Sequence, residues 1–339
     1  MAEPRDPVAD LRRIAYLLER AQEPTYRVRA FRTAAATAAA LPPGELRHRT
    51  DAGTLQELPG IGQVTAGAIA ESLAGAVPVY LQRLEPAGEQ PVAPGGEGLR
   101  ATLRGDLHTH SDWSDGGSPI EEMAVAARAL GHDYIALTDH SPRLTVANGL
   151  TAQRLRDQLR VVADLNERLA PVRILTGIEV DINADGTLDQ DQDLLDSLDI
   201  VVASVHSKLR MPAAEMTPRM VRAVANPAVD ILGHCTGRMV AGRGRPESQF
   251  DADLVFEACR RFGVAVEVNC RPERLDPPRR LLRAAVEAGC VVSIDTDAHA
   301  PGQLEWQPYG CARAQECGIG PDVVVNTWTV ERLLAWTRA

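Results

Sequence analysis

From about residue 100 to the C-terminus, short apolar β-branched runs alternate with helical segments, and this alternation restricts the possible fold more than any other feature. A parallel sheet wrapped by helices shows this pattern, because its strands are buried on both faces. Seven candidate strands end in GDLHTH, YIALTDH, ILTGIEVDI, IVVASVH, DILGHCTG, VAVEVNC and VVSIDTDAH. The predicted helices between them include PIEEMAVAARALG, TAQRLRDQLRVVADLNERLA and PPRRLLRAAVEAG. The pattern predicts an α/β fold, a closed or distorted seven-stranded β/α barrel whose functional residues gather at the carboxyl ends of the strands.

The chain before residue 85 shows a second pattern, which is entirely helical. Apolar residues recur with helical spacing on one face of the first segment, at Val8, Leu11, Ala15 and Leu18. Thr54 and Glu57 fit a capping box for a short helix. Gly60 and Gly62 then permit a tight turn into a second helix over about residues 64–73. These segments predict a small all-helical domain.

The two patterns are separated by EPAGEQPVAPGGEG, residues 85–98, which is rich in Pro and Gly and almost free of large apolar side chains. That composition is typical of a flexible connector. We therefore expect a helical domain over residues 1–84, a flexible linker over residues 85–99 and a barrel domain over residues 100–339.

Six of the eight histidines lie at the carboxyl ends of predicted strands: His108, His110, His140, His206, His234 and His299. His48 and His132 lie elsewhere, and we interpret both as structural. Three carboxylates lie in the same places, at Asp115, Glu179 and Asp297. In a strand, side chains at positions i and i+2 project from the same face, so the paired histidines can converge on one cation.

Nine such groups exceed what a single ion can use, because zinc takes about four ligands. Mixed nitrogen and oxygen donors suit zinc, manganese or iron, so we expect a cluster of two or three divalent ions. Closely spaced metal ions activate water and stabilise both oxygens of an in-line displacement at phosphorus. The sequence therefore predicts a phosphoric ester hydrolase.

The motifs also resemble those of the PHP (polymerase and histidinol phosphatase) superfamily, from about residue 103 to the C-terminus. The similarity is carried by DLHTHSDWSDG, ALTDHS, GIEVDI, ASVHS, GHCTGR, EVNCRPERLD and DTDAH. The resemblance implies a distorted seven-stranded barrel, the PHP fold, which holds three metal ions. It also implies that a metal-bound hydroxide is the nucleophile, with Glu179, Asp297 and His299 among the catalytic residues.

By analogy with that superfamily, the nine groups divide among three ions. His108, His110, Glu179 and Asp297 would hold the first. Glu179, His206 and His234 would hold the second, with Glu179 as the bridge. Asp115, His140 and His299 would hold the third.

Within the superfamily, the sequence is most similar to the PHP domain of bacterial family X DNA polymerases, through TDHSPRLTVANGL, HCTGRMVAGRGRP and NCRPERLDPPRRLLRAAVEAG. Guanidinium groups bind phosphate oxygens well. Arginines are frequent in the loops after the strands, at Arg143, Arg238, Arg243, Arg245, Arg271 and Arg274. Arg143 and Arg238, each three or four residues beyond an expected ligand, are our candidates for contact with the substrate phosphate.

The N-terminal segment with LPGIGQVTAGAIAESL resembles the lyase-type domain of family X polymerases, including its helix-hairpin-helix. A turn at Gly60 and Gly62 would expose backbone N–H groups that hold a DNA phosphate without reading sequence; a hairpin used only for packing is the alternative. Ala68 stands where DNA polymerase beta has its Schiff-base lysine, and Val64 occupies a second lysine position. No palm or fingers separate the two domains. We therefore expect neither lyase nor polymerase activity.

The expected function is hydrolysis of DNA phosphoesters in DNA repair, as a 3′-to-5′ exonuclease, 3′-phosphatase or abasic-site endonuclease. One alternative is a small-molecule phosphatase of the histidinol phosphate type, and another is a noncatalytic DNA-binding protein with a structural metal cluster. No run of 18 apolar residues occurs, and the opening MAEPRDPVAD does not fit a secretory signal. We expect a cytoplasmic protein with DNA, and no membrane, as its partner.

Overall fold

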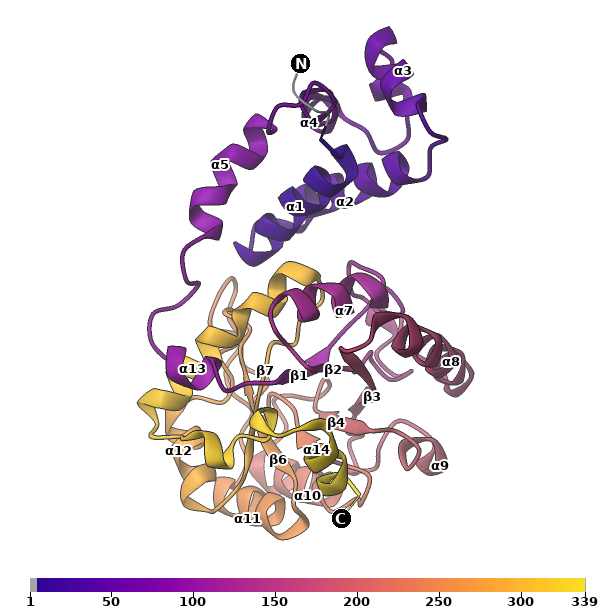
Figure 1. Ribbon diagram of the computed structural model, residues 1–339. Helices are drawn as coiled ribbons and strands as arrows, with labels where there is room; N and C mark the ends of the chain where they lie inside the picture. Colours follow the sequence, from indigo (N-terminus) through magenta and orange to yellow (C-terminus); the bar gives the residue numbers. More distant parts are fainter. Residues whose placement is uncertain (1–4, 339) are drawn as a thin grey trace. The chain divides into compact units, whose positions relative to one another are not determined.

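The computed structural model describes residues 5–338, which fall into two compact units divided between Pro91 and Val92 (Figure 1). The division lies inside the expected linker, but that segment is helical at both ends. Helix α5 (Val79–Gly88) runs four residues into it, and α6 (Glu97–Arg100) begins within it. Leu81 of α5 is buried in the helical core, so packing overrides the composition here.

The first unit is all helical, as expected. Its elements are α1 (Pro7–Arg20), α2 (Thr25–Ala39), α3 (Glu45–Ala52), the 3₁₀ turn η1 (Leu55–Glu57), α4 (Gln63–Leu73) and α5. The Asp6 side chain caps α1 by accepting from the N–H of Val8 at 2.9 Å. The core of this unit is built from one face of each of the main helices and includes Leu11, Ile14, Leu18, Phe31 and Ile69.

The hairpin between η1 and α4 differs from the expectation in its cap. Thr54 makes no side-chain capping bond, and the segment after it is a single 3₁₀ turn, too short to need one. The hydroxyl of Thr65 instead accepts from the N–H of Gly62 at 3.0 Å. Gly60 has φ of +75°, and a Cβ there would lie 2.3 Å from Cγ2 of Thr33, so the turn requires glycine at this position.

The second unit is built on seven parallel strands in the order β1 to β7, which confirms the predicted sheet. The strands are β1 (Gly105–Thr109), β2 (Tyr134–Leu137), β3 (Arg173–Asp181), β4 (Ile200–Ser204), β5 (Ile231–Leu232), β6 (Ala265–Asn269) and β7 (Val292–Asp295). Each strand pairs with the next along the chain, and every strand is buried over most of its length.

Strands β1 and β7 come together at the seam of the barrel, where side chains replace much of the backbone ladder. Asp295 accepts from the N–H of Leu107 at 2.8 Å, and Asp106 accepts from the N–H of Thr296 at 3.2 Å. A single parallel bridge joins Thr109 to residue 298. The seven strands therefore form a nearly closed barrel.

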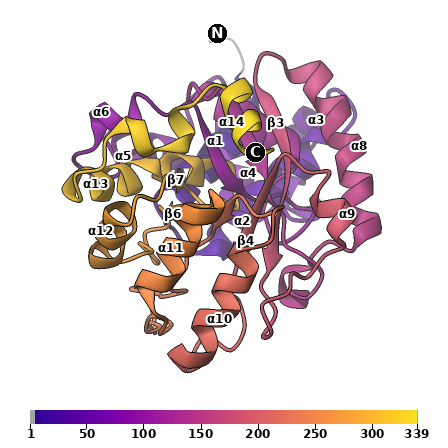
Figure 2. The ribbon, with the colours of Figure 1, turned by 90° about the horizontal axis from the view of Figure 1, so that it is seen from below.

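Helices surround this barrel (Figure 2). They are α7 (Ile120–Ala129), α8 (Ala152–Leu169), α9 (Gln192–Leu195), α10 (Ala213–Val224), α11 (Ala252–Phe262), α12 (Arg279–Glu287), α13 (Gln307–Glu316) and α14 (Val330–Trp336). Short 3₁₀ turns occur at η2 (Thr145–Ala147), η3 (Pro301–Trp306), η4 (Pro321–Val323) and η5 (Val325–Thr327). Helix α8 shows how they pack, because Leu155, Val162, Leu165 and Leu169 form its buried stripe. Across residues 5–338, no helix combines the length and apolar character needed to cross a membrane.

Candidate metal centre

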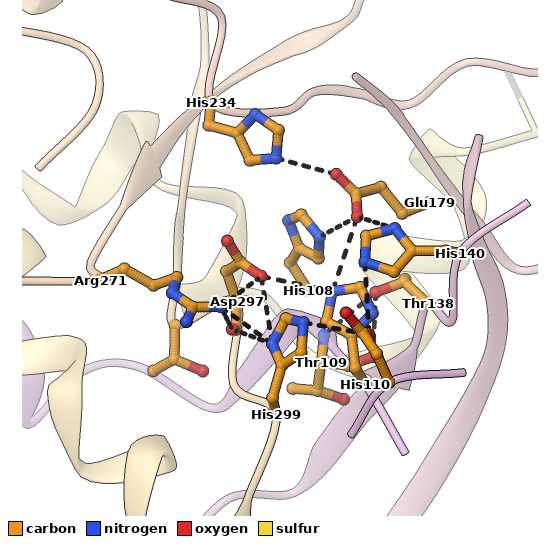
Figure 3. Close-up of polar contacts among 12 residues, drawn as sticks. His108, Thr109, His110, Thr138, His140, Glu179, His234, Arg271, Asp297 and His299 are labelled. Carbon is orange, nitrogen blue, oxygen red and sulfur yellow. Dashed lines mark hydrogen bonds and ion pairs between the residues drawn. The ribbon is translucent and has the colours of Figure 1, made fainter. Parts of the chain in front are cut away.

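The nine metal-competent side chains meet at the carboxyl ends of the strands. Figure 3 labels His108, His110, His140, Glu179, His234, Asp297 and His299 among them. His108 and Glu179 lie on β1 and β3 themselves. The remaining groups follow the strands directly or lie in the next loop: His110, Asp115, His140, His206, His234, Asp297 and His299. Parallel strands deliver these groups to one edge because all their carboxyl ends lie on the same side of the barrel.

Glu179 lies at the centre of the group. Its Oε1 lies 2.9 Å from Nε2 of His234 and 3.2 Å from Nε2 of His206. Its Oε2 lies 2.8 Å from Nδ1 of His140 and 3.3 Å from Nε2 of His108. One buried carboxylate therefore faces histidines from four different strand ends, as a bridging ligand would.

Asp115 contacts two histidines of the group, His299 and His140. Its Oδ1 lies 3.3 Å from Nε2 of His299 and 3.5 Å from Nε2 of His140. The His110 ring lies between these two histidines, with ring centroids 4.1 Å from that of His299 and 4.4 Å from that of His140. Asp297 approaches the same ring, its Oδ1 3.3 Å from Nε2 of His110.

Several of these ligand atoms are buried and make no hydrogen bond among the described residues, although some lie within ion-pair distance of one another; they include His108 Nε2, both ring nitrogens of His110, His140 Nδ1 and Glu179 Oε2. An unpaired buried polar atom is costly, so their convergence fits cations at their common centre. Histidine nitrogens and carboxylate oxygens are ligands that suit zinc, manganese and iron. The residues present therefore fit a centre of several divalent ions.

Candidate ligand atoms form three sets, and within each set the atoms lie within 4.8 Å of one another. They are His110, Asp115, His140 and His299; His108, His110 and Glu179; and His140, Glu179 and His206. The first contains the whole predicted third ligand set and adds His110. The second keeps the first predicted set without Asp297, and the last joins His140, instead of His234, to Glu179 and His206.

The electrostatics of the site follow from burial and from opposite charges at short range. The burial of Glu179 is outweighed by the histidines around it, chiefly His206 and His108, which hold its pKa well below the usual range. Burial and the neighbouring His299 and His140 lower the pKa of His110 well below the usual value. A neutral imidazole and an ionised carboxylate are the forms that bind metal.

Three polar residues that the sequence analysis did not identify hold the ligands in place. Glu267 on β6 lies 2.6 Å from Nδ1 of His108, and Asp181 on β3 lies 2.5 Å from Nδ1 of His206. Asn269 donates to Oδ2 of Asp297 at 3.1 Å. The strand segments VAVEVNC and GIEVDI contain a signal for them, because in a strand alternate residues share one face and each of the three is a polar residue within an otherwise apolar strand.

The arginines of the loops after the strands have different partners. Arg143 donates to Oδ1 of Asn183 at 3.1 Å, and Arg238 donates to backbone carbonyls, including that of Arg274 at 3.1 Å. Arg271 lies 3.0 Å from Nδ1 of His299. Arg271 and Arg274 also approach the Asp297 carboxylate, at 3.6 and 3.4 Å. The predicted contact of Arg143 and Arg238 with the substrate phosphate stays a prediction.

Asp297 has φ of +53°, a left-handed conformation that a residue with a side chain rarely adopts. Such backbone strain persists where the surrounding structure enforces it, and it is concentrated at functional sites. His132, by contrast, is buried and lies 3.1 Å from Nη2 of Arg100, as expected for a structural histidine. His48 lies on α3.

The helix-hairpin-helix turn can offer fewer donors than expected. The N–H of Gly62 already donates to Thr65, and the N–H of Ile61 donates to the Leu58 carbonyl at 3.2 Å. The first residues of α4, Gln63 and Val64, are exposed. The N–H groups that begin α4 are therefore the ones placed to meet a phosphate.

Fold and site together define a β/α-barrel metal-dependent hydrolase. The profile of the PHP domain matches residues 106–271, and that of a helix-hairpin-helix domain matches residues 4–76. The chain belongs to the PHP family, which confirms the resemblance seen in its motifs, and it is a phosphoric ester hydrolase.

A Bacillus subtilis (strain 168) protein named DNA polymerase/3′-5′ exonuclease PolX is 44% identical over 236 residues, which are 70% of this chain and 41% of that protein. A probable phosphatase of Thermoanaerobacter sp. (strain X514) is 30% identical over 233 residues, 66% of this chain and 89% of that protein. Among solved structures, a histidinol phosphate phosphatase from Lactococcus lactis aligns with a TM-score of 0.47 and 18% identity, over 64% of this chain and 95% of that one. The chain thus spans less than half the length of the PolX protein.

Proposed function

We propose that the protein hydrolyses DNA phosphoesters, as a 3′-to-5′ exonuclease, 3′-phosphatase or abasic-site endonuclease in DNA repair. The observation that carries this proposal is the pairing, in one chain, of the centre formed by the nine side chains with a helix-hairpin-helix domain. The 44% identical relative is named as a 3′-5′ exonuclease, which also supports it.

Manganese, zinc or iron ions, two or three in number, would activate water there and neutralise charge on the reacting phosphate. The chain itself supplies the frame. Glu179 and the histidines would hold the ions, and Oδ1 of Asp297 lies 3.3 Å from Nε2 of His110 and 3.5 Å from Nδ1 of His299. Arg274 directs its buried Nε toward Asp297, while its side chain as a whole is partly exposed, and it would bind a phosphate oxygen.

For the N-terminal unit, we propose contact with one backbone phosphate of DNA through the first turn of α4, which the turn at Gly60 and Gly62 presents. A helix N-terminus attracts anions without reading bases, so binding would be independent of sequence. Residues 1–50 carry nine arginines against six acidic residues, an excess of positive charge in a chain whose net charge is −10.

A small-molecule phosphatase is the second candidate, because a 30% identical relative is named a probable phosphatase. One assay separates the two. The purified protein with manganese is given 5′-labelled single-stranded DNA, histidinol phosphate and an aryl phosphate in parallel. We expect DNA to be degraded, and Asp297→Ala to abolish the degradation. Rapid turnover of histidinol phosphate with intact DNA would establish the second candidate instead.

A pair of variants tests the helical domain. Val64 is 57% exposed at the start of α4, and Val64→Asp places a negative charge where the phosphate would bind. Ala74→Asp makes the same charge change at the opposite, exposed end of the helix. We expect Val64→Asp alone to weaken DNA binding, about tenfold, with aryl phosphate hydrolysis unchanged. Equal DNA affinity in the two variants would contradict the proposed contact.

A further inference from the structure

A cavity of about 620 Å³ opens between the loop that follows β5 and the first turns of α10 and α12. Its lining includes Arg238, Arg245, Glu247, Gln249, Phe250 and Arg280, and we call it the arginine cavity. These segments follow the carboxyl ends of β4, β5 and β6, on the side of the barrel that carries the metal centre.

The arginine cavity has an excess of positive charge. Three guanidinium groups line it, and Glu247 is the single acidic residue in the lining. Its Oε1 lies 3.5 Å from Nη1 of Arg238, while its Oε2 pairs with Arg280, so one carboxylate is shared by two arginines. The third, Arg245, donates through Nε to the Gly237 carbonyl at 2.5 Å, which leaves its terminal nitrogens for another acceptor.

The direction of one pKa agrees with this excess. Burial and the positive charge of Arg274 lower the pKa of Arg245, with only partial compensation from Asp276. A guanidinium in such surroundings is stabilised by an added anion. The overall net charge of −10 makes this local concentration of arginine distinctive.

Short bonded paths join the arginine cavity to the metal centre. Arg238 donates to the Arg274 carbonyl, and the Arg274 guanidinium lies 3.4 Å from Oδ2 of Asp297. On the other wall, the His234 carbonyl accepts from the N–H of Gly237 at 2.8 Å, and Gly237 in turn holds Arg245. The same two segments therefore carry metal ligands, or their immediate partners, and cavity arginines.

We propose that the arginine cavity binds a non-scissile phosphate of the DNA strand whose reacting phosphoester lies at the metal centre. This inference rests on the proposed DNA hydrolase function and adds a second anchoring point to it. Guanidinium forks match phosphate oxygens. Val240, which is 53% exposed, and Phe250 give the same cavity an apolar wall for a sugar or base. Glu247 competes with the phosphate for Arg238 and Arg280.

The first test reverses one charge. Arg280 has a 64% exposed side chain, so Arg280→Glu should fold normally. Arg283→Glu, at an exposed position of the same helix, is the matched control. We expect Arg280→Glu to raise the KM for a ten-nucleotide single strand about tenfold, and to lower the slope of log KM against log salt by about 0.7. In Arg280→Glu, the KM for thymidine 5′-p-nitrophenyl phosphate, which has one phosphate, should change less than about twofold. In Arg283→Glu, the KM values for both substrates should change less than about twofold.

The second test predicts the opposite sign. Glu247→Gln removes the competing charge and leaves the shape of the side chain, so the KM for the ten-nucleotide strand should fall about threefold or more. If the ion pairs of Glu247 with Arg238 and Arg280 are purely structural, the KM for the ten-nucleotide strand should rise or stay the same in Glu247→Gln.

The possible failures can be told apart. If the wild-type protein hydrolyses the p-nitrophenyl ester but no DNA, the proposed function is overturned, and this inference with it. If the wild-type protein degrades DNA while Arg280→Glu matches Arg283→Glu, or raises KM equally for both substrates, only the arginine cavity is overturned as a strand-binding site.

Discussion

Nδ1 of His108 donates to the Glu267 carboxylate at 2.6 Å, and this bond between β1 and β6 turns Nε2 of the ring toward Glu179. Both side chains are fully buried. The carboxylate also accepts from the N–H of His234 at 2.5 Å, so one residue positions two of the nine groups. Partners of this kind fix the tautomer of a ligating histidine and raise its basicity.

The variant Glu267→Gln should therefore weaken metal binding by about 10- to 100-fold, because an amide can present N–H to His108 and favour the wrong tautomer. Metal content after dialysis, measured by mass spectrometry, should fall, and activity should return in excess manganese. Glu287→Gln, on the exposed side of α12, serves as the control. Full metal content in Glu267→Gln would show that the bond has no such role.

Removal of the metal ions should destabilise the protein, since the buried donors around Glu179 would then lack partners. A ligand at 100 times its Kd adds about 2.7 kcal/mol to the free energy of unfolding. We expect a chelator to lower Tm by about 5–10 °C, and added manganese or zinc to restore it. In Glu179→Gln the chelator should have much less effect. An unchanged Tm after verified metal loss would contradict this account of the centre.

Arg274 should matter more for hydrolysis than Arg143. Nε of Arg274 is buried without a hydrogen bond in the part of the chain that the structure describes, and it lies 3.4 Å from Oδ2 of Asp297. Arg143 is held by Asn183 instead. We expect Arg274→Gln to lower kcat/KM for an aryl phosphate about 100-fold. Arg143→Gln should lower kcat/KM for the same substrate by no more than about tenfold. The reverse order would restore Arg143 as the arginine that contacts the phosphate.

Asp230 should make stability depend on pH. Its carboxyl is buried and accepts from the N–H of Val201 at 2.7 Å, and burial raises its pKa well above the usual range. The folded state thus favours the protonated form. The stability that this proton contributes is complete below about pH 4, the pKa of the unfolded chain, and is lost as pH rises through the folded pKa.

Asp230→Asn stays neutral at every pH, so its advantage over the natural protein should grow with pH. We expect the difference in Tm between variant and natural protein to be more favourable at pH 8 than at pH 5, by at least about 2 °C. Asp164→Asn, at an exposed position of α8, should show no such trend. If the difference in Tm between Asp230→Asn and the natural protein is the same at pH 5 and pH 8, the raised pKa of Asp230 is refuted.

The sequence alone was sufficient for the strands, the barrel and the nine candidate ligands. The reason is that these depend on local pattern: a buried parallel strand is a short apolar run, and its carboxyl end is marked by the polar residues that follow. His108 and His110 can be assigned to one face from their spacing of two, without knowledge of any other strand. The segment Gly60 to Gly62 is likewise a local turn signal.

The tertiary structure decided which of those groups face one another. The register of the strands sets Glu267 of β6 against His108 of β1, and it brings histidines from the ends of β1, β2, β4 and β5 to Glu179 of β3; no local pattern contains that register. The same holds for Arg274 at Asp297 and for the cavity around Glu247, where contacts join segments that follow different strands. Packing of Leu81 also extended α5 into a segment whose composition indicated a linker. Spacing along the chain fixes where a side chain points from its own strand, whereas the closure of the barrel fixes what that side chain meets.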